Sequence, residues 1–179
     1  MMAFKDLFNF KKNPKIELPW TKKEVWLLFI ALLPLYFQFQ EFYAAYQNMP
    51  STIPIHFNLE GVVDGRAPKE LLKWVGLFEI LLTSTVLFFA HKVYLNNMPL
   101  FKITERNAEE VYRRCRLFML AIIGLLNLML TLLGHQILLL VSGELQQLDN
   151  RVLYYPLGAV AVLITGFLFR MRRVKQTPF

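Results

Sequence analysis

Two groups of residues in this chain have types and spacings that could do chemistry. The first is a run of polar residues and prolines between positions 49 and 69, directly after a long apolar segment. The second is a set of polar and ionisable side chains inside apolar runs, where such groups are costly and mark function by default. Both groups suit recognition of a ligand or an ion.

The first group predicts a small ordered element. Residues 53–57 are β-prone, and Pro54 restricts them to an extended or edge strand. Residues 58–61 and the pair Asp64-Gly65 are turn signals. We therefore expect a β-like loop lying on the surface. The candidate recognition residues in it are Pro50, Ile53, Pro54, His56, Phe57, Asn58, Gly61, Asp64 and Lys69.

Two interpretations of this loop stay open. In one, His56, Asn58 and Asp64 form a recognition or ion site together with Glu60. In the other, His56 and Asn58 only bond backbone groups, and Gly61 supplies a positive φ. With one His and no Cys the loop predicts no zinc site, which needs three or four ligands.

The second group predicts an interior polar cluster. Asn127, Thr131 and His135 recur at every fourth residue, so they share one helix face. Glu79 lies at a similar predicted depth, and two earlier polar residues fall in the same half of the membrane. The alternative is that these groups only hold helices together. The candidate cluster comprises Glu79, Asn127, Thr131, His135, Gln38 and Glu41.

No catalytic residue is predicted. Glu109 and Glu110 precede Arg114 in the Glu-Glu-x-x-x-Arg pattern of intramembrane CAAX-type proteases, but the paired His motifs of those enzymes are missing. Ordinary pairing of Glu110 with Arg114 four residues on accounts for the pattern. The sequence also has no His-Glu-x-x-His, phosphate loop or nucleophile elbow. We expect a protein that is not an enzyme and has no metal or cofactor.

The elements that must position these residues are membrane spans. The 179 residues are 55% hydrophobic with a net charge of +7, which suits a nucleic-acid binder or a membrane protein. The charges are bunched between long uncharged runs, so the membrane class is favoured over specific nucleic-acid binding. The predicted spans are residues 25–46, 74–90, 117–143 and 152–169, the third being long enough to tilt or protrude.

Basic residues predict the orientation. Sixteen of the 20 Lys and Arg residues fall in the N-terminal segment, the 92–116 loop and the C-terminal tail, and four fall in the other two loops. Both termini are therefore expected in the cytoplasm of a multi-pass protein of the cell membrane. The expected fold class is all-α, a four-helix transmembrane bundle with a small extracellular β-like loop between helices 1 and 2. Its parts are a basic interfacial segment (1–23), a four-span domain (24–175) with the motif loop at 47–70, and a tail (176–179).

The motif loop resembles a bacterial membrane domain of unknown function found in SdpI-type immunity proteins. The shared pattern is Pro-x-x-Ile-Pro-x-His-Phe-Asn from Pro50 to Asn58, followed by Gly61, Asp64 and Lys69. Met49 replaces the Leu that usually precedes this pattern, and the chain has four spans where longer immunity proteins have more.

The resemblance implies an immunity or signalling protein in a bacterial cell membrane. Such a protein would recognise an extracellular toxic peptide or an envelope partner. Its other expected partners are the lipid bilayer and, at the 92–116 loop, a cytosolic repressor or anionic lipid. The alternative function is a small ion-coupled transporter or permease subunit that uses Glu79.

Overall fold

A computed structural model describes residues 13–96 and 103–174 of the chain. Residues 1–12 of the expected interfacial segment and the tail at 176–179 lie outside the described residues. The elements in order are α1 (Lys22–Ala45), β1 (Thr52–Phe57), β2 (Val63–Pro68), α2 (Leu71–His91), the short 3-10 helix η2 (Val93–Leu95), α3 (Ala108–Ser142) and α4 (Arg151–Arg172). The predicted fold class is confirmed: four long helices with a two-stranded antiparallel sheet between the first two.

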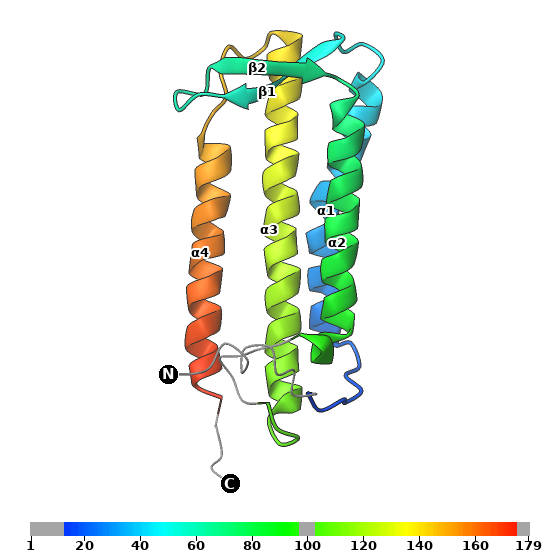
Figure 1. The fold of residues 1–179 in the computed structure, drawn as a ribbon, viewed down its shortest axis with the longest axis vertical. Coiled ribbons are helices and arrows are strands. Elements are labelled where there is room, and N and C mark those ends of the chain that lie inside the picture. The colour runs from blue at the N-terminus through cyan, green and yellow to red at the C-terminus, as the bar shows by residue number, and fades with distance from the viewer. Residues whose placement is uncertain (1–12, 97–102, 175–179) are drawn as a thin grey trace, which may run out of the picture.

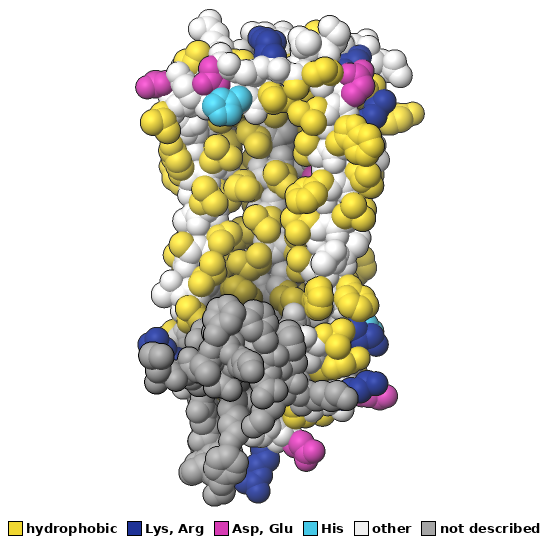
Figure 2. Space-filling model, in the orientation of Figure 1, with side chains coloured by type: hydrophobic (Ala, Val, Ile, Leu, Met, Phe, Trp, Pro, Cys, Tyr) yellow, Lys and Arg dark blue, Asp and Glu magenta, His cyan; other side chains and the backbone are white. Residues whose placement is uncertain are grey.

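The bundle is organised around α3, because α1, α2 and α4 each pack against it (Figure 1). All four helices are long and apolar enough to cross a membrane. Figure 2 shows that the charged side chains gather at the two ends and that the surface between them is mostly hydrophobic. The chain is therefore an integral membrane protein with a hairpin end, which carries β1 and β2, and an opposite basic end.

Local sequence signals set the helix ends. Thr21 begins α1 with a capping box, in which its backbone N–H donates to Glu24 Oε2 at 2.7 Å. Gly143 ends α3 with a φ of 82°, a left-handed conformation that glycine adopts at little cost. α3 begins nine residues earlier than the predicted apolar run. Its 35 residues span about 52 Å, so it extends beyond a hydrocarbon core of about 30 Å.

The sheet lies across the end of the bundle (Figure 1). Ile53 pairs with Ala67 and His56 with Gly65, with register irregularities on both sides of His56. The expectation that Asp64-Gly65 forms a second turn is wrong, because both residues lie within β2. The hairpin needs only the turn at residues 58–62.

Two apolar cores close the ends of the bundle. At the hairpin end, Met49, Ile53 and Leu72 are buried against Phe42, Ala45, Leu138 and Val141. At the basic end, Tyr112 and Cys115 of α3 pack with Val93 and with Met171 of α4. The first core fixes the hairpin to α1, α2 and α3, so the motif loop is a docked element.

Candidate functional site

The turn of the hairpin is built by Asn58 and Gly61. Asn58 Oδ1 accepts hydrogen bonds from the backbone N–H groups of Glu60 at 3.0 Å and Val62 at 2.9 Å. Gly61 has a φ of 83°, and a Cβ there would lie 2.2 Å from the carbonyl oxygen of Leu148. Its own carbonyl accepts from the Leu148 N–H at 2.8 Å. Both residues therefore hold the turn and attach it to the loop between α3 and α4.

Further motif residues fix the hairpin to the helices. Ile53 is fully buried in the core at this end, and Pro54 is among the largest fully buried side chains. Lys69 Nζ donates to the carbonyls of Tyr46 and Met49, both at 3.1 Å, and lies 4.8 Å from the ring centroid of Tyr46. Lys69 thus satisfies backbone acceptors at the end of α1, where helix carbonyls lack intrahelical partners.

Two motif residues instead face outward. His56 Nδ1 lies 2.5 Å from Asp64 Oδ1, and the two side chains are 73% and 46% exposed. Nearby, Leu59 at the turn is 86% exposed, and Ile55 and Val62 are also exposed. The exposed side chains of the hairpin at His56, Asp64, Ile55, Leu59 and Val62 are together called the outer face below. It combines apolar contact area with a polar pair that can donate to or accept from a ligand.

Within the membrane, Glu79 is paired with Gln38. Gln38 Nε2 donates to Glu79 Oε2 at 2.7 Å, and the two residues are only 3% and 1% exposed. Glu79 Oε1 and Gln38 Oε1 have no hydrogen-bond partner among the described residues. The sequence places Glu79 at a depth similar to that of Asn127 and Thr131, and the partner that the structure gives it is Gln38 of α1, another member of the candidate cluster.

The other predicted cluster residues make separate contacts. Asn127 accepts from the Thr83 hydroxyl at 3.1 Å and donates to the Ala31 carbonyl at 3.0 Å. Thr131 bonds within its own helix to the Asn127 carbonyl. His135 Nδ1 lies 3.1 Å from Glu41 Oε1, and both side chains are about half exposed. These contacts join α1 to α2 and α3 at several heights.

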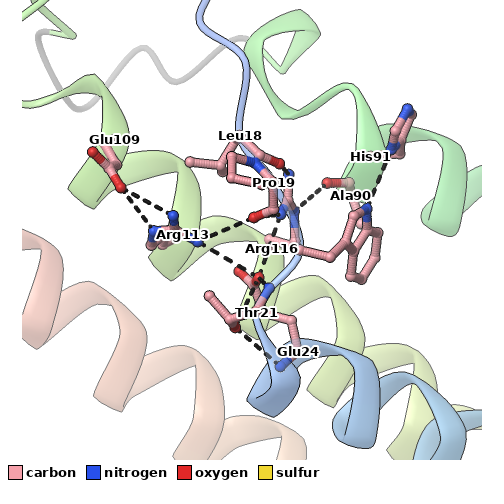
Figure 3. Close-up of polar contacts among 10 residues, drawn as sticks. Leu18, Pro19, Thr21, Glu24, Ala90, His91, Glu109, Arg113 and Arg116 are labelled. Carbon is pink, nitrogen blue, oxygen red and sulfur yellow. Dashed lines mark hydrogen bonds and ion pairs between the residues drawn. The ribbon is translucent and has the colours of Figure 1, made fainter.

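A buried charged network lies at the basic end, and sequence reasoning missed it (Figure 3). Glu24 and Arg116 are 1% and 0% exposed, with Arg116 Nη1 3.4 Å from Glu24 Oε2. Arg113 Nη1 lies 3.6 Å from the same oxygen. Arg116 also donates to the carbonyls of Ala90 at 2.9 Å and Leu18 at 3.0 Å. The guanidinium of Arg116 therefore ties α1, α2 and α3 together.

Trp20 completes this network. Its ring lies 4.7 Å from the Arg116 guanidinium carbon, and its indole N–H donates to His91 Nδ1 at 3.4 Å. From the sequence, Arg116 was used only as one of the basic residues that predict the orientation. That use does not distinguish an exposed arginine from a buried one, so it gave no indication that Arg116 pairs with Glu24. The available signal was the spacing of Thr21 and Glu24, a capping box that places Glu24 at the membrane boundary.

Among the described residues, no three His, Cys, Asp or Glu side chains gather in a way that could hold a metal ion. The contacts described above support hydrogen bonding and apolar contact at the outer face, and proton or ion binding at the Gln38–Glu79 pair.

Comparison with known proteins identifies one domain. Residues 25–78 match a family described as a domain of unknown function, DUF1648. The match covers most of α1, the hairpin and the start of α2, so it includes every motif residue and Gln38 and ends one residue before Glu79. No curated protein and no solved structure matches the chain.

Proposed function

We propose that this protein is a non-enzymatic membrane receptor whose hairpin recognises a secreted peptide or an envelope partner, as an SdpI-like immunity or signalling protein would. The observation that supports this most is that some motif residues are used for structure, whereas two others are exposed. Asn58, Gly61 and Lys69 are used to build and attach the hairpin. His56 and Asp64 bond only one another in the described chain and face outward.

The outer face suits a peptide ligand. Exposed apolar side chains grouped beside polar ones mark interaction sites on proteins. Here Leu59, Ile55 and Val62 supply apolar area, and the His56–Asp64 pair supplies polar specificity. The unpaired outer edges of a two-stranded sheet also offer backbone groups to an extended peptide.

The distribution of basic residues supports an outward-facing hairpin and cytoplasmic termini. A ligand arriving from outside would then meet the outer face first. The 92–116 segment at the basic end would be the output surface, where a cytosolic repressor or anionic lipid could bind. α1 and α2 connect the hairpin directly to that end, and Glu24 and Ala90 on them contact Arg116.

The test is a pair of variants, His56→Ala and Asp64→Ala, with Glu70→Ala as the matched control. Glu70 is exposed at the same end but lies outside the outer face. Cells expressing each variant at the wild-type level would be challenged with each secreted peptide encoded beside the gene. We expect both outer-face variants to lose protection and the control to keep it. Full protection by both variants would refute recognition through the outer face.

A second candidate function is a small ion-coupled transporter. The observation that favours it is the buried Gln38–Glu79 pair with an unpartnered oxygen on each side chain. Glu79→Gln separates the two functions. In reconstituted vesicles, a transporter carrying this change should lose proton- or ion-coupled uptake, whereas in challenged cells a peptide receptor carrying it should keep its protection phenotype.

A further inference from the structure

An apolar groove runs along the bundle between α1, α3 and α4. Its volume is about 830 Å³, and its walls include Leu27, Pro34, Ala121, Leu128 and Val162. Gly124 of α3 lies in close contact with Ala31 of α1, whereas the main helix contact of α4 is with α3. The groove therefore lies on the side of α1 and α3 that α4 only partly covers.

At the basic end the groove continues into a second hollow of about 420 Å³. The two share Leu27, Ala121, Val162 and Leu163 as lining residues. The second hollow adds three basic residues from three different helices, Lys23, Arg114 and Arg170. Basic side chains on three separate elements thus converge on the mouth of one apolar groove.

The mouth carries a net positive charge. Arg114 forms an ion pair with Glu110 and donates to the carbonyl of Arg170. Lys23 and Arg170 form no ion pair with any described residue. Among the described residues that line the hollow, none is acidic. Within the described chain, two cations at the mouth are thus available to hold an anion.

The groove is at least as long as one lipid leaflet is thick. From Lys23 to Phe37 on α1 is fourteen residues, or about 21 Å, and from Arg170 to Ala159 on α4 is eleven, or about 17 Å. The hydrocarbon core is about 30 Å thick, so the groove reaches from one surface past the midplane. An acyl chain of one leaflet fits within that length.

We propose that this groove is a binding site for an anionic phospholipid. Lys23, Arg114 and Arg170 hold the phosphate headgroup, and one acyl chain lies in the apolar groove along Leu27, Ala121 and Leu163. Basic pockets between transmembrane helices bind anionic headgroups in this way. A second copy of the chain in the same orientation fits less well, because it would bring its own basic end against these cations. The site is independent of the outer face, and of the 92–116 segment it uses only Arg114.

The test uses the full chain reconstituted in nanodiscs that contain phosphatidylglycerol and phosphatidylcholine in equal amounts. Lipids that stay bound after transfer to detergent are counted by native mass spectrometry. The charge variant is Lys23→Gln with Arg170→Gln, and its control is Arg172→Gln, which lies outside the groove. The groove variant is Gly166→Leu, and its control is Gly158→Leu. A side chain at either glycine meets open space, but of the two only Gly166 lines the second hollow, through which the groove opens at the basic end.

We expect the wild-type chain to retain one phosphatidylglycerol in strong preference to phosphatidylcholine. The charge variant should lose about fivefold of this preference for each basic residue, the change that about 1 kcal/mol produces. Gly166→Leu should lose the retained lipid altogether, and both control variants should behave like wild type. Added free glycerol phosphate should not displace the lipid, because it has no acyl chain for the groove.

Three results would overturn the proposal. One is equal retention of the two lipids by the wild-type chain, which would mean ordinary boundary lipid. Another is displacement by free glycerol phosphate at equal concentration, which would mean a phosphate site without a lipid. The third is a dimer in the wild-type spectrum that Gly166→Leu abolishes, which would assign the groove to a second copy.

Discussion

The attachment of the hairpin to the loop between α3 and α4 is the contact most open to a quantitative test. Gly61→Ala places a Cβ where the Leu148 carbonyl oxygen now lies, at a separation of 2.2 Å. Because atoms do not approach so closely, the hairpin and the loop must move apart. The hydrogen bond from the Leu148 N–H to the Gly61 carbonyl is then lost.

The expected cost has two parts. Alanine at a φ of 83° costs about 1–2 kcal/mol relative to a conformation that L-residues favour. Loss of the hydrogen bond adds about 1 kcal/mol. Gly143→Ala is a close match, because Gly143 has a φ of 82° but nothing within 4 Å of an added Cβ. Gly143→Ala should show only the cost of the backbone conformation, so the destabilisation by Gly61→Ala should be larger by at least about 1 kcal/mol.

The assay is limited proteolysis of the hairpin, combined with unfolding in mixed micelles of neutral detergent and dodecyl sulfate. Local opening that is about 1–2 kcal/mol easier raises the cleavage rate about 5–30-fold. We expect Gly61→Ala to be cleaved faster than Gly143→Ala within residues 52–68. Equal cleavage rates and equal unfolding midpoints for the two variants would show that the contact with Leu148 does not hold the hairpin.

Four further predictions concern the charged and polar residues. Glu24→Leu leaves Arg116 as a buried unpaired charge and should lower the free energy of unfolding by about 3–5 kcal/mol in the same micelle assay. Adding Arg116→Met removes that charge and should recover part of the lost free energy. A double variant as unstable as Glu24→Leu alone would contradict this. Glu79→Leu leaves the Gln38 amide without its partner and should lower the free energy of unfolding by about 1–3 kcal/mol, whereas Glu79→Gln should lower it by less than about 1 kcal/mol. Equal losses of stability in the two variants would exclude the hydrogen bond as the cause. Hydrogen bonds from Arg151 hold the pKa of Asp149 below its usual value. The stabilisation that they provide is therefore present above about pH 4 and lost as pH falls through the pKa of the folded state. The free energy of unfolding, measured from about pH 5 to about pH 2, should show this loss in wild type and not in Asp149→Asn. In a Cys115→Ser background, a cysteine at Ser51 should react with an impermeant thiol reagent on intact cells and one at Glu105 should not, and the reverse pattern would invert the orientation.

The sequence was sufficient to predict the membrane spans because their signal is local. Charge-free runs of about 20 residues give helix positions directly, since a bilayer core sets the length. The start of α3 was harder to predict. Residues Ala108 to Arg116 are charged and amphipathic, so hydropathy alone assigns them to a loop. That stretch is helical because its apolar side, including Val111 and Tyr112, packs into the core at the basic end.

The candidate site was predictable only where its signal is local in the sequence. The turn at Asn58 and Gly61 follows from residue type, and the structure shows both in turn-forming contacts. The partner of Glu79 was not predictable, since depth alone fits several residues and the rotation of each helix about its axis decides which one it meets. Asp64-Gly65 was misassigned because a turn dipeptide can also lie in a short, irregular strand, as it does opposite His56.

The polar contacts inside the bundle show how a signal from the hairpin could be transmitted. Each of four contacts has α1 as one partner: Glu24 with Arg116, the Ala31 carbonyl with Asn127, Gln38 with Glu79, and Glu41 with His135. Directional bonds therefore hold α1 to α2 and α3 at several heights, from one end of the bundle to the other.

α4 is held differently. Between its ends it meets α3 through apolar contacts such as the stacked rings of Phe118 and Phe167, whose centroids are 4.2 Å apart. Apolar packing is non-directional, and in a membrane lipid chains can replace it. The polar contact of α4 with α3 is at its basic end, where Arg114 donates to the Arg170 carbonyl, so α4 can shift at its other end without breaking that bond. The loop before α4 contacts the hairpin through Leu148 and Asn150. A ligand that displaces the hairpin should therefore move α4 against a fixed unit of α1, α2 and α3, and change the width of the groove beside it.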